Sequence, residues 1–140
     1  MNRLNDRGQA LTLFVIFVPV IIMVGVLATD MSYARYQSRK LDNINKEVIK
    51  YGLNHLSDDP YNDMVDLIYK NDDEIDSYEI NIDNLDQKIN VVIKKSTTGF
   101  FGKIIGKDIY EEKSSYEGKI IDNKISIKKG DLNWRKKLQR

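Results

Sequence analysis

The side chains that could carry out chemistry are few and lie far apart in the sequence. His55 is the single histidine among the 140 residues. A catalytic histidine needs a nucleophile held against it, and the sequence contains no G-x-S-x-G or comparable signature. The lack of cysteine excludes disulfides and thiolate metal sites. We therefore predict a non-enzymatic protein without a cofactor, in which His55 lies at the surface near a helix end.

Acidic residues cluster at two places, Asp58-Asp59 and Asp72-Asp73-Glu74. Carboxylate oxygens are the ligands that calcium prefers in proteins. Neither cluster has the residue spacing of an EF-hand calcium loop, and runs of like charge are usually solvated. We expect both clusters to form exposed turns, and we predict no metal site.

Aromatic residues offer the best candidates for contact with a partner. The run Gly99-Phe100-Phe101-Gly102 lacks the Gly-Lys-Ser/Thr ending of a phosphate-binding loop. It favours a turn with core aromatics, and Phe100 and Phe101 are candidates for an apolar partner contact. Trp134 lies in a basic tail, 128–140, which suits anionic lipid, cell-wall polymer or nucleic acid if it is not simply solvated.

The overall charge excludes a strong general attraction to polyanions. The chain has 22 basic and 21 acidic residues, a formal net charge of +1. We therefore expect no nucleic-acid partner. The length suits one domain, because removal of the apolar N-terminal part leaves roughly a hundred residues, enough for one modest core.

The most apolar part of the chain is the run LTLFVIFVPVIIMVGVLA at residues 11–28, which has no charged side chain. Its 18 residues make about 27 Å of helix, close to the thickness of the hydrocarbon layer. It also lacks the polar stripe of a core helix. We predict a basic segment over 1–10 and a transmembrane helix over 11–29, with membrane lipid as partner. A cleaved secretory signal is less favoured, because Val26 stands where cleavage needs a small residue.

Three residues inside this span affect how it can pack. Pro19 removes one backbone hydrogen bond and is expected to bend the helix, which lipid-embedded helices tolerate. Gly25 and Ala28 are small enough to let a neighbouring helix approach closely. Basic residues flank the span on both sides, so charge alone leaves its orientation undecided.

Beyond the span the apolar residues continue at helical spacing. We expect one helix from about residue 10 to 56, about 70 Å long, which ends at Asp58-Asp59-Pro60 because proline disfavours helix in the residue before it. Its second part is amphipathic and should lay one apolar stripe on a sheet. That stripe consists of Ala34, Leu41, Ile44, Val48 and Tyr51, with His55 next along it.

The rest of the chain changes from helical to strand periodicity. Residues 62–70 indicate a short helix, after which apolar and polar residues alternate. The fold class predicted is α+β: a long N-terminal helix, transmembrane and then amphipathic, packed on a small antiparallel sheet. The expected parts are strands at 78–83, 89–93, 108–121 and 125–127, a turn at 83–86, a helical turn ending at Gly106, a soluble domain over 30–127, and the tail 128–140.

Two stretches resemble the TadE/TadG-like family, pseudopilin-type membrane proteins of Flp (tight-adherence) pilus systems. They occur in the family's order and together cover a little over half of the chain. The matching residues are Arg7-Gly8-Gln9-Ala10-Leu11, Phe14, Val18-Pro19, Gly25, Asp30, Tyr33, Arg35-Tyr36 and Leu41, and then Ile89-Asn90-Val91-Val92-Ile93, Thr97, Phe100-Phe101 and Ile104-Ile105-Gly106.

The resemblance implies a pilin-like domain outside the cytoplasmic membrane, with other pilus or secretion subunits as partners of the transmembrane helix. It also implies a processing site between Gly8 and Gln9. TadE-type members carry a glutamate five residues after the processing glycine, where this chain has Leu13. The family's alanine-rich repeat is replaced here by the bulkier, more polar 43–49.

These observations lead to two hypotheses about function. The first is a non-enzymatic, membrane-anchored, pseudopilin-like component of a Flp-type pilus or related secretion apparatus. The alternative is a membrane-tethered extracytoplasmic binding module that contacts cell wall or lipid. Both place a single-pass protein in the cell membrane of a bacterium, with its C-terminal domain outside the cytoplasm.

Overall fold

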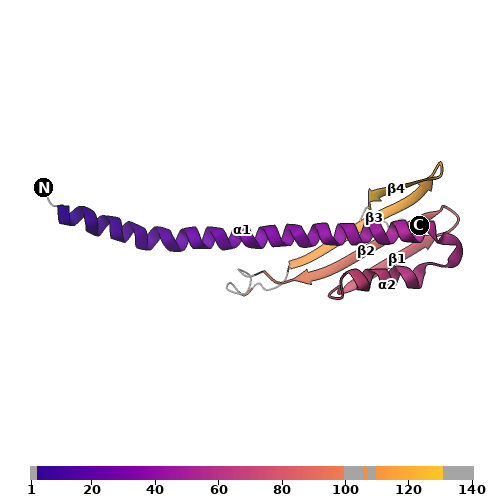
Figure 1. Cartoon of the computed structure of the whole chain (residues 1–140), viewed down its shortest axis with the longest axis horizontal. Coiled ribbons are helices and arrows are strands. Elements are labelled where there is room, and N and C mark those ends of the chain that lie inside the picture. Colours follow the sequence, from indigo (N-terminus) through magenta and orange to yellow (C-terminus); the bar gives the residue numbers. More distant parts are fainter. Residues whose placement is uncertain (1–2, 100–105, 107–109, 131–140) are drawn as a thin grey trace, which may run out of the picture.

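The computed structural model describes residues 3–99, 106 and 110–130. The N-terminal part of one long helix projects from a small domain (Figure 1). The domain consists of the C-terminal part of that helix, a second helix and a sheet. This is the α+β arrangement predicted. The elements in chain order are α1 (Arg3–Asn54), a 3₁₀ turn η1 (Leu56–Asp58), α2 (Tyr61–Asn71), β1 (Ser77–Asp83), β2 (Lys88–Thr97), β3 (Tyr110–Ile121) and β4 (Lys124–Lys129).

Helix α1 is continuous over 52 residues, about 78 Å at 1.5 Å per residue. It contains Pro19, and Figure 1 shows its axis bending in the N-terminal part. The predicted single helix is therefore confirmed. It begins earlier than expected, at Arg3, and ends at Asn54, two residues before the expected boundary.

The sheet is an antiparallel meander in the order β1-β2-β3-β4. The Asp83 carboxylate begins the β1–β2 turn by accepting the backbone N–H groups of Leu85 and Asp86, at 3.1 and 3.2 Å. Asp122 and Asn123 join β3 to β4 with φ values of 50° and 59°, the conformation of a two-residue type I′ hairpin. Asp and Asn tolerate this left-handed backbone better than most residues, so local sequence explains the turn.

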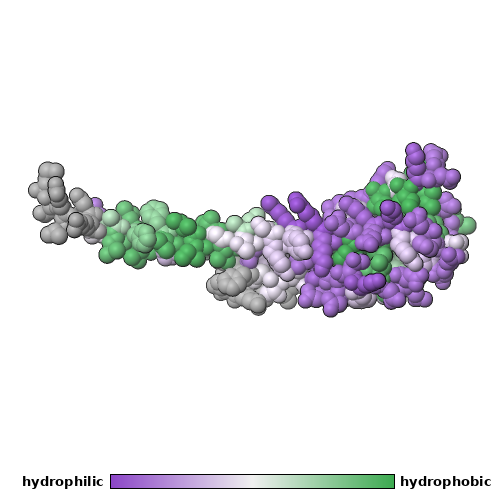
Figure 2. Space-filling model, in the orientation of Figure 1, coloured by the Kyte–Doolittle hydropathy of each residue, from purple (hydrophilic) through white to green (hydrophobic). Residues whose placement is uncertain are grey.

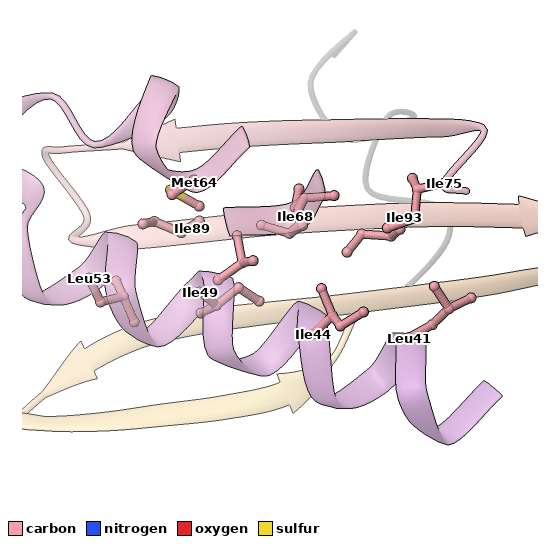
Figure 3. Packing of buried hydrophobic residues seen from close by; sticks show 11 residues of the cluster. Leu41, Ile44, Ile49, Leu53, Met64, Ile68, Ile75, Ile89 and Ile93 are labelled. Atoms are coloured by element: carbon pink, nitrogen blue, oxygen red, sulfur yellow. The ribbon is translucent and has the colours of Figure 1, made fainter. Parts of the chain in front are cut away.

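The core lies between the helices and one face of the sheet, with β2 at its centre (Figure 3). Leu41, Ile44 and Val48 of the predicted stripe are buried, whereas Ala34 and Tyr51 are only partly buried. At Gly118 of β3, the Ile49 side chain occupies the space that a Cβ would need, so α1 packs very close to this strand. The buried cluster consists of Leu41, Ile44, Val48, Ile49 and Leu53 of α1, Met64 and Ile68 of α2, Ile75, and Ile89, Val91 and Ile93 of β2.

The predicted boundaries differ from the structure in two places. Strand β4 continues through Lys128 and Lys129, so the sheet ends two residues inside the region expected to be tail. The Gly130 N–H extends this order further by donating to the Ser115 carbonyl oxygen at 2.8 Å. The expected start of the third strand at 108 and most of the helical turn before Gly106 lie outside the described residues.

Candidate functional site

The largest exposed apolar surface is the N-terminal half of α1 (green in Figure 2). None of its most apolar 18-residue window, of mean hydropathy 2.9, is buried against the described part of the chain. Leu11, Phe14 and Ile21 are each 67% exposed. This stretch is therefore no core helix of the domain, and its length and composition are compatible with a single-pass membrane anchor.

The hydroxyl groups along this segment are satisfied by the helix itself. Thr12, Thr29 and Ser32 each donate to the carbonyl oxygen four residues earlier, at 2.9, 3.0 and 2.8 Å. Such bonds remove the cost of placing a free hydroxyl in hydrocarbon. The backbone and the hydroxyl groups from residue 10 to 29 thus fit a lipid environment.

The sheet reaches α1 at Asp30, the first charged residue after the apolar run. A Cβ built on Gly99, just beyond β2, would lie 2.9 Å from an Asp30 carboxylate oxygen and 2.7 Å from the Tyr110 ring. The end of β2 and the start of β3 therefore flank the helix where the apolar segment stops. No separate linker joins the apolar segment to the domain, because α1 itself runs through both.

A buried ion cluster joins three elements on the helix side of the sheet. Lys95 of β2 donates to both carboxylate oxygens of Asp72 at 2.9 Å and contacts Glu74 at 3.0 Å. Lys40 of α1 approaches the same Asp72 carboxylate at 2.8 Å. Asp72, which caps the C-terminus of α2, is 5% exposed and Lys95 is 2% exposed. The expectation of an exposed turn is wrong for Asp72, although Asp73 and Glu74 are exposed.

The charges in this cluster are held by hydrogen bonds. Burial alone raises the pKa of Asp72, but hydrogen bonds from Lys40 and Lys95 outweigh it and leave that pKa below its ordinary value. Burial alone lowers the pKa of Lys95, and hydrogen bonds to Asp72 and Glu74 reverse the shift and raise it. Both groups are therefore ionised at neutral pH. An ion pair that is this strongly held serves structure better than proton transfer.

A second buried polar group ties α1 to the middle of the sheet. Asn45 is fully buried, and its amide donates to the backbone oxygens of Val91 and Ser114 at 3.1 and 3.2 Å. The Ser114 hydroxyl in turn donates to Asp42 at 2.6 Å. Asn45 follows Leu41 by four residues, so helical spacing alone could have placed it on the buried face.

The remaining candidates for chemistry are confirmed as surface groups. His55 is exposed just after α1, stacks on Tyr51 with 4.3 Å between ring centroids, and bonds the Tyr51 carbonyl oxygen through Nδ1 at 2.9 Å. Within the described ranges, no group of three or more His, Asp or Glu side chains could hold a metal ion.

The other predicted site residues lie on α1 or outside the described chain. The residues on α1 share an exposed environment, and a Cβ on Gly8 or Gly25 would meet nothing within 4 Å. Comparison with protein-family models, curated proteins and solved structures finds no match. The resemblance to the TadE/TadG-like family stays a prediction. Gly8, Gln9, Pro19, Gly25 and Ala28 are on α1, whereas Phe100, Phe101 and Trp134 lie outside the described residues.

Proposed function

We propose that this chain is a non-enzymatic, single-pass membrane subunit of a Flp-type pilus or related secretion apparatus. The observation that carries the proposal is the continuity of α1, whose exposed apolar half runs without a break into the core of the sheet domain. A rigid helix shared by membrane and domain fixes the height and direction of the domain above the bilayer. That arrangement suits a subunit that holds its domain at a fixed position in an assembly, rather than one that captures a soluble ligand.

The small residues of α1 supply the contact with other subunits. Gly25 and Ala28 lie on the exposed apolar part of the helix, where they admit a second helix at short distance. The resemblance adds the outward orientation of the sheet domain and a processing site between Gly8 and Gln9. It also makes other pilus or secretion subunits the expected partners of α1.

Co-purification tests this proposal. Full-length tagged protein, extracted from native membranes in mild detergent, is expected to bring down subunits of a pilus or secretion apparatus. The matched control is Gly25→Leu with Ala28→Leu, which keeps the span apolar but blocks close helix approach; we expect at least severalfold lower recovery of partners. Mass spectrometry of the same sample should find a mature chain that starts at Gln9.

Two results would contradict the proposal. One is a native membrane complex that contains no pilus or secretion subunit. The other is recovery of the same partners by the doubly substituted control. Retention of cell-wall polymer or lipid alone would favour the tethered binding module instead.

A further inference from the structure

The sheet has two open edges. Strand β1 pairs only with β2, and β4 pairs only with β3, within the part of the chain that the structure describes. Every second N–H and C=O group of such an edge strand points away from its neighbour and can pair with another strand. The two strands are similar in length, seven residues in β1 and six in β4.

The edges carry opposite charge. Strand β1 has two acidic residues, Glu79 and Asp83, and no lysine or arginine, whereas β4 has three lysines and no acidic residue. Between them, central-strand charges pair with each other, as in Lys88–Glu117 at 3.0 Å. Three strand spacings separate β1 from β4, about 14 Å, which exceeds the screening length of about 8 Å at physiological salt. The two edges therefore do not neutralise one another within one chain.

The two edge sequences also match residue by residue. Strand β1 contains Glu79-Ile80-Asn81-Ile82-Asp83, and β4 contains Lys124-Ile125-Ser126-Ile127-Lys128. In both, the isoleucines face the helices, because Ile80 lies opposite Val91 and Ile127 lies opposite Gly118 in the ladders. The charged and amide or hydroxyl side chains alternate onto the other face.

The isoleucines at the edges are incompletely covered in a single chain. Ile80, Ile82, Ile125 and Ile127 are partly buried and pack against the rim of the core. Helix α1 lies mainly on β2 and β3 and touches β4 little, and Figure 1 shows β4 extending beyond the helix. A further strand at either edge would cover the part of this apolar surface that is still exposed.

We propose that β4 of one copy pairs with β1 of a second copy of this chain. The antiparallel register sets acid against base at both ends, isoleucine against isoleucine, and amide against hydroxyl. Pairing of like edges is disfavoured, because β1 would meet β1 with carboxylates opposed and β4 would meet β4 with lysines opposed. The proposed pairs are Glu79–Lys128, Ile80–Ile127, Asn81–Ser126, Ile82–Ile125 and Asp83–Lys124.

Antiparallel pairing is compatible with anchoring of both copies in one membrane. The meander has four strands, so β1 and β4 run in opposite directions, and two copies inserted in the same sense present antiparallel edges. Sheet twist of about 20–25° per strand turns the second domain by roughly 80–100° relative to the first. Opposite tilts of the two anchors, each up to about 40°, absorb most of that rotation. The geometry thus suits a pair of copies in a flat bilayer.

Disulfide cross-linking between two full-length variants tests the pairing, since the chain has no native cysteine. Asn81→Cys and Ser126→Cys are co-expressed, and native membranes are oxidised. We expect a cross-linked dimer only when both variants are present. The matched control is Ser57→Cys, on the exposed η1 turn, combined with Ser126→Cys, which should give only background. Background levels for the first pair, or equal levels for the control, would overturn the proposal.

Charged residues on edge strands often prevent association. Charge reversal distinguishes that role from the specific pairing proposed here. In the Asn81→Cys chain, Glu79→Lys should lower the cross-linked fraction roughly two- to fivefold. Adding Lys128→Glu to the Ser126→Cys chain should restore it. An unchanged yield after the first reversal, or no recovery after the second, would contradict the assigned register. This proposal uses the membrane anchor but no pilus subunit, so its failure would leave the co-purification result standing.

Discussion

Replacing Asp72 with alanine is expected to lower the free energy of unfolding of the domain by about 3–5 kcal/mol. The substitution removes the carboxylate that receives both Lys95, which is 2% exposed, and Lys40. Glu74 still contacts Lys95 at 3.0 Å, but its side chain is 77% exposed and cannot replace a buried partner. The lysine is then left as a poorly compensated charge in the interior. The change is measured by unfolding the full-length protein with urea in detergent micelles. Limited proteolysis monitors how much of the domain has unfolded at each urea concentration.

The neighbouring residue provides the control for this prediction. Asp73 has the same side chain and lies in the same turn, but it is exposed. Asp73→Ala should change the stability by no more than about 0.5 kcal/mol, as is usual for surface substitutions. Equal effects of the two substitutions would show that the ion cluster does not stabilise the fold.

The buried ion pair between Asp72 and Lys95 also predicts how the free energy of unfolding depends on pH. The pKa of Asp72 is lowered in the folded protein from an ordinary value of 3.8, so its contribution is present above that pH. The contribution is lost as the pH falls through the lower, folded value. Wild-type protein should therefore lose stability in acid more steeply than Asp72→Ala. Parallel pH profiles for the two proteins would contradict the ionised pair.

Two arginines within the apolar half of α1 are expected to abolish stable membrane association. Ile16→Arg with Ile21→Arg places two charges near the middle of the proposed span, where each costs about 2.5–3.5 kcal/mol on insertion. Both positions are more than half exposed, at 58% and 67%, so neither substitution disturbs packing inside the domain. The measurement is the fraction of protein that resists alkaline extraction from membranes.

A second double substitution with the same spacing controls for added charge. Met31→Arg with Tyr36→Arg places two arginines on exposed positions of the same helix, just after the apolar run. This protein should stay in the membrane fraction. Loss of both variants, or retention of both, would count against a span confined to residues 11–29. Release of a shortened wild-type chain would show that the segment is a cleaved signal.

The helix and strands could be predicted because their signals are local. Leu41, Ile44 and Val48 recur at helical spacing, and Ile89, Val91 and Ile93 alternate as a strand buried on one face does. The Asp122-Asn123 hairpin likewise depends on two adjacent residues. The predicted boundaries were less accurate: β4 continues to Lys129, whereas the predicted strand ended at 127. The sequence does not reveal this extension, because a lysine side chain ends in solvent whether or not its backbone is paired in a sheet.

The buried ion cluster could not be predicted, because its members are distant in sequence. Asp72 lies 23 residues from Lys95 and 32 from Lys40, and three elements must pack before these side chains meet. In the sequence Asp72 is one member of an acidic run, and such runs are solvated more often than not. The opposite charges of the two edge strands could not be recognised from the sequence for a related reason. Only the strand order β1-β2-β3-β4 shows that the acidic and basic strands are the open ones.

The central claim is that α1 crosses the membrane and holds the sheet domain on the outer side. Single-cysteine labelling tests it most directly, against the cysteine-free background of the natural chain. Leu85→Cys is the domain site, because Leu85 is 98% exposed in the β1–β2 turn, and Asn5→Cys is the N-terminal site. In intact cells, a membrane-impermeant maleimide should label the cysteine at position 85 and not the one at position 5. Labelling at 5 and not at 85 would place the sheet in the cytoplasm, contradict the claim, and exclude the proposed external role.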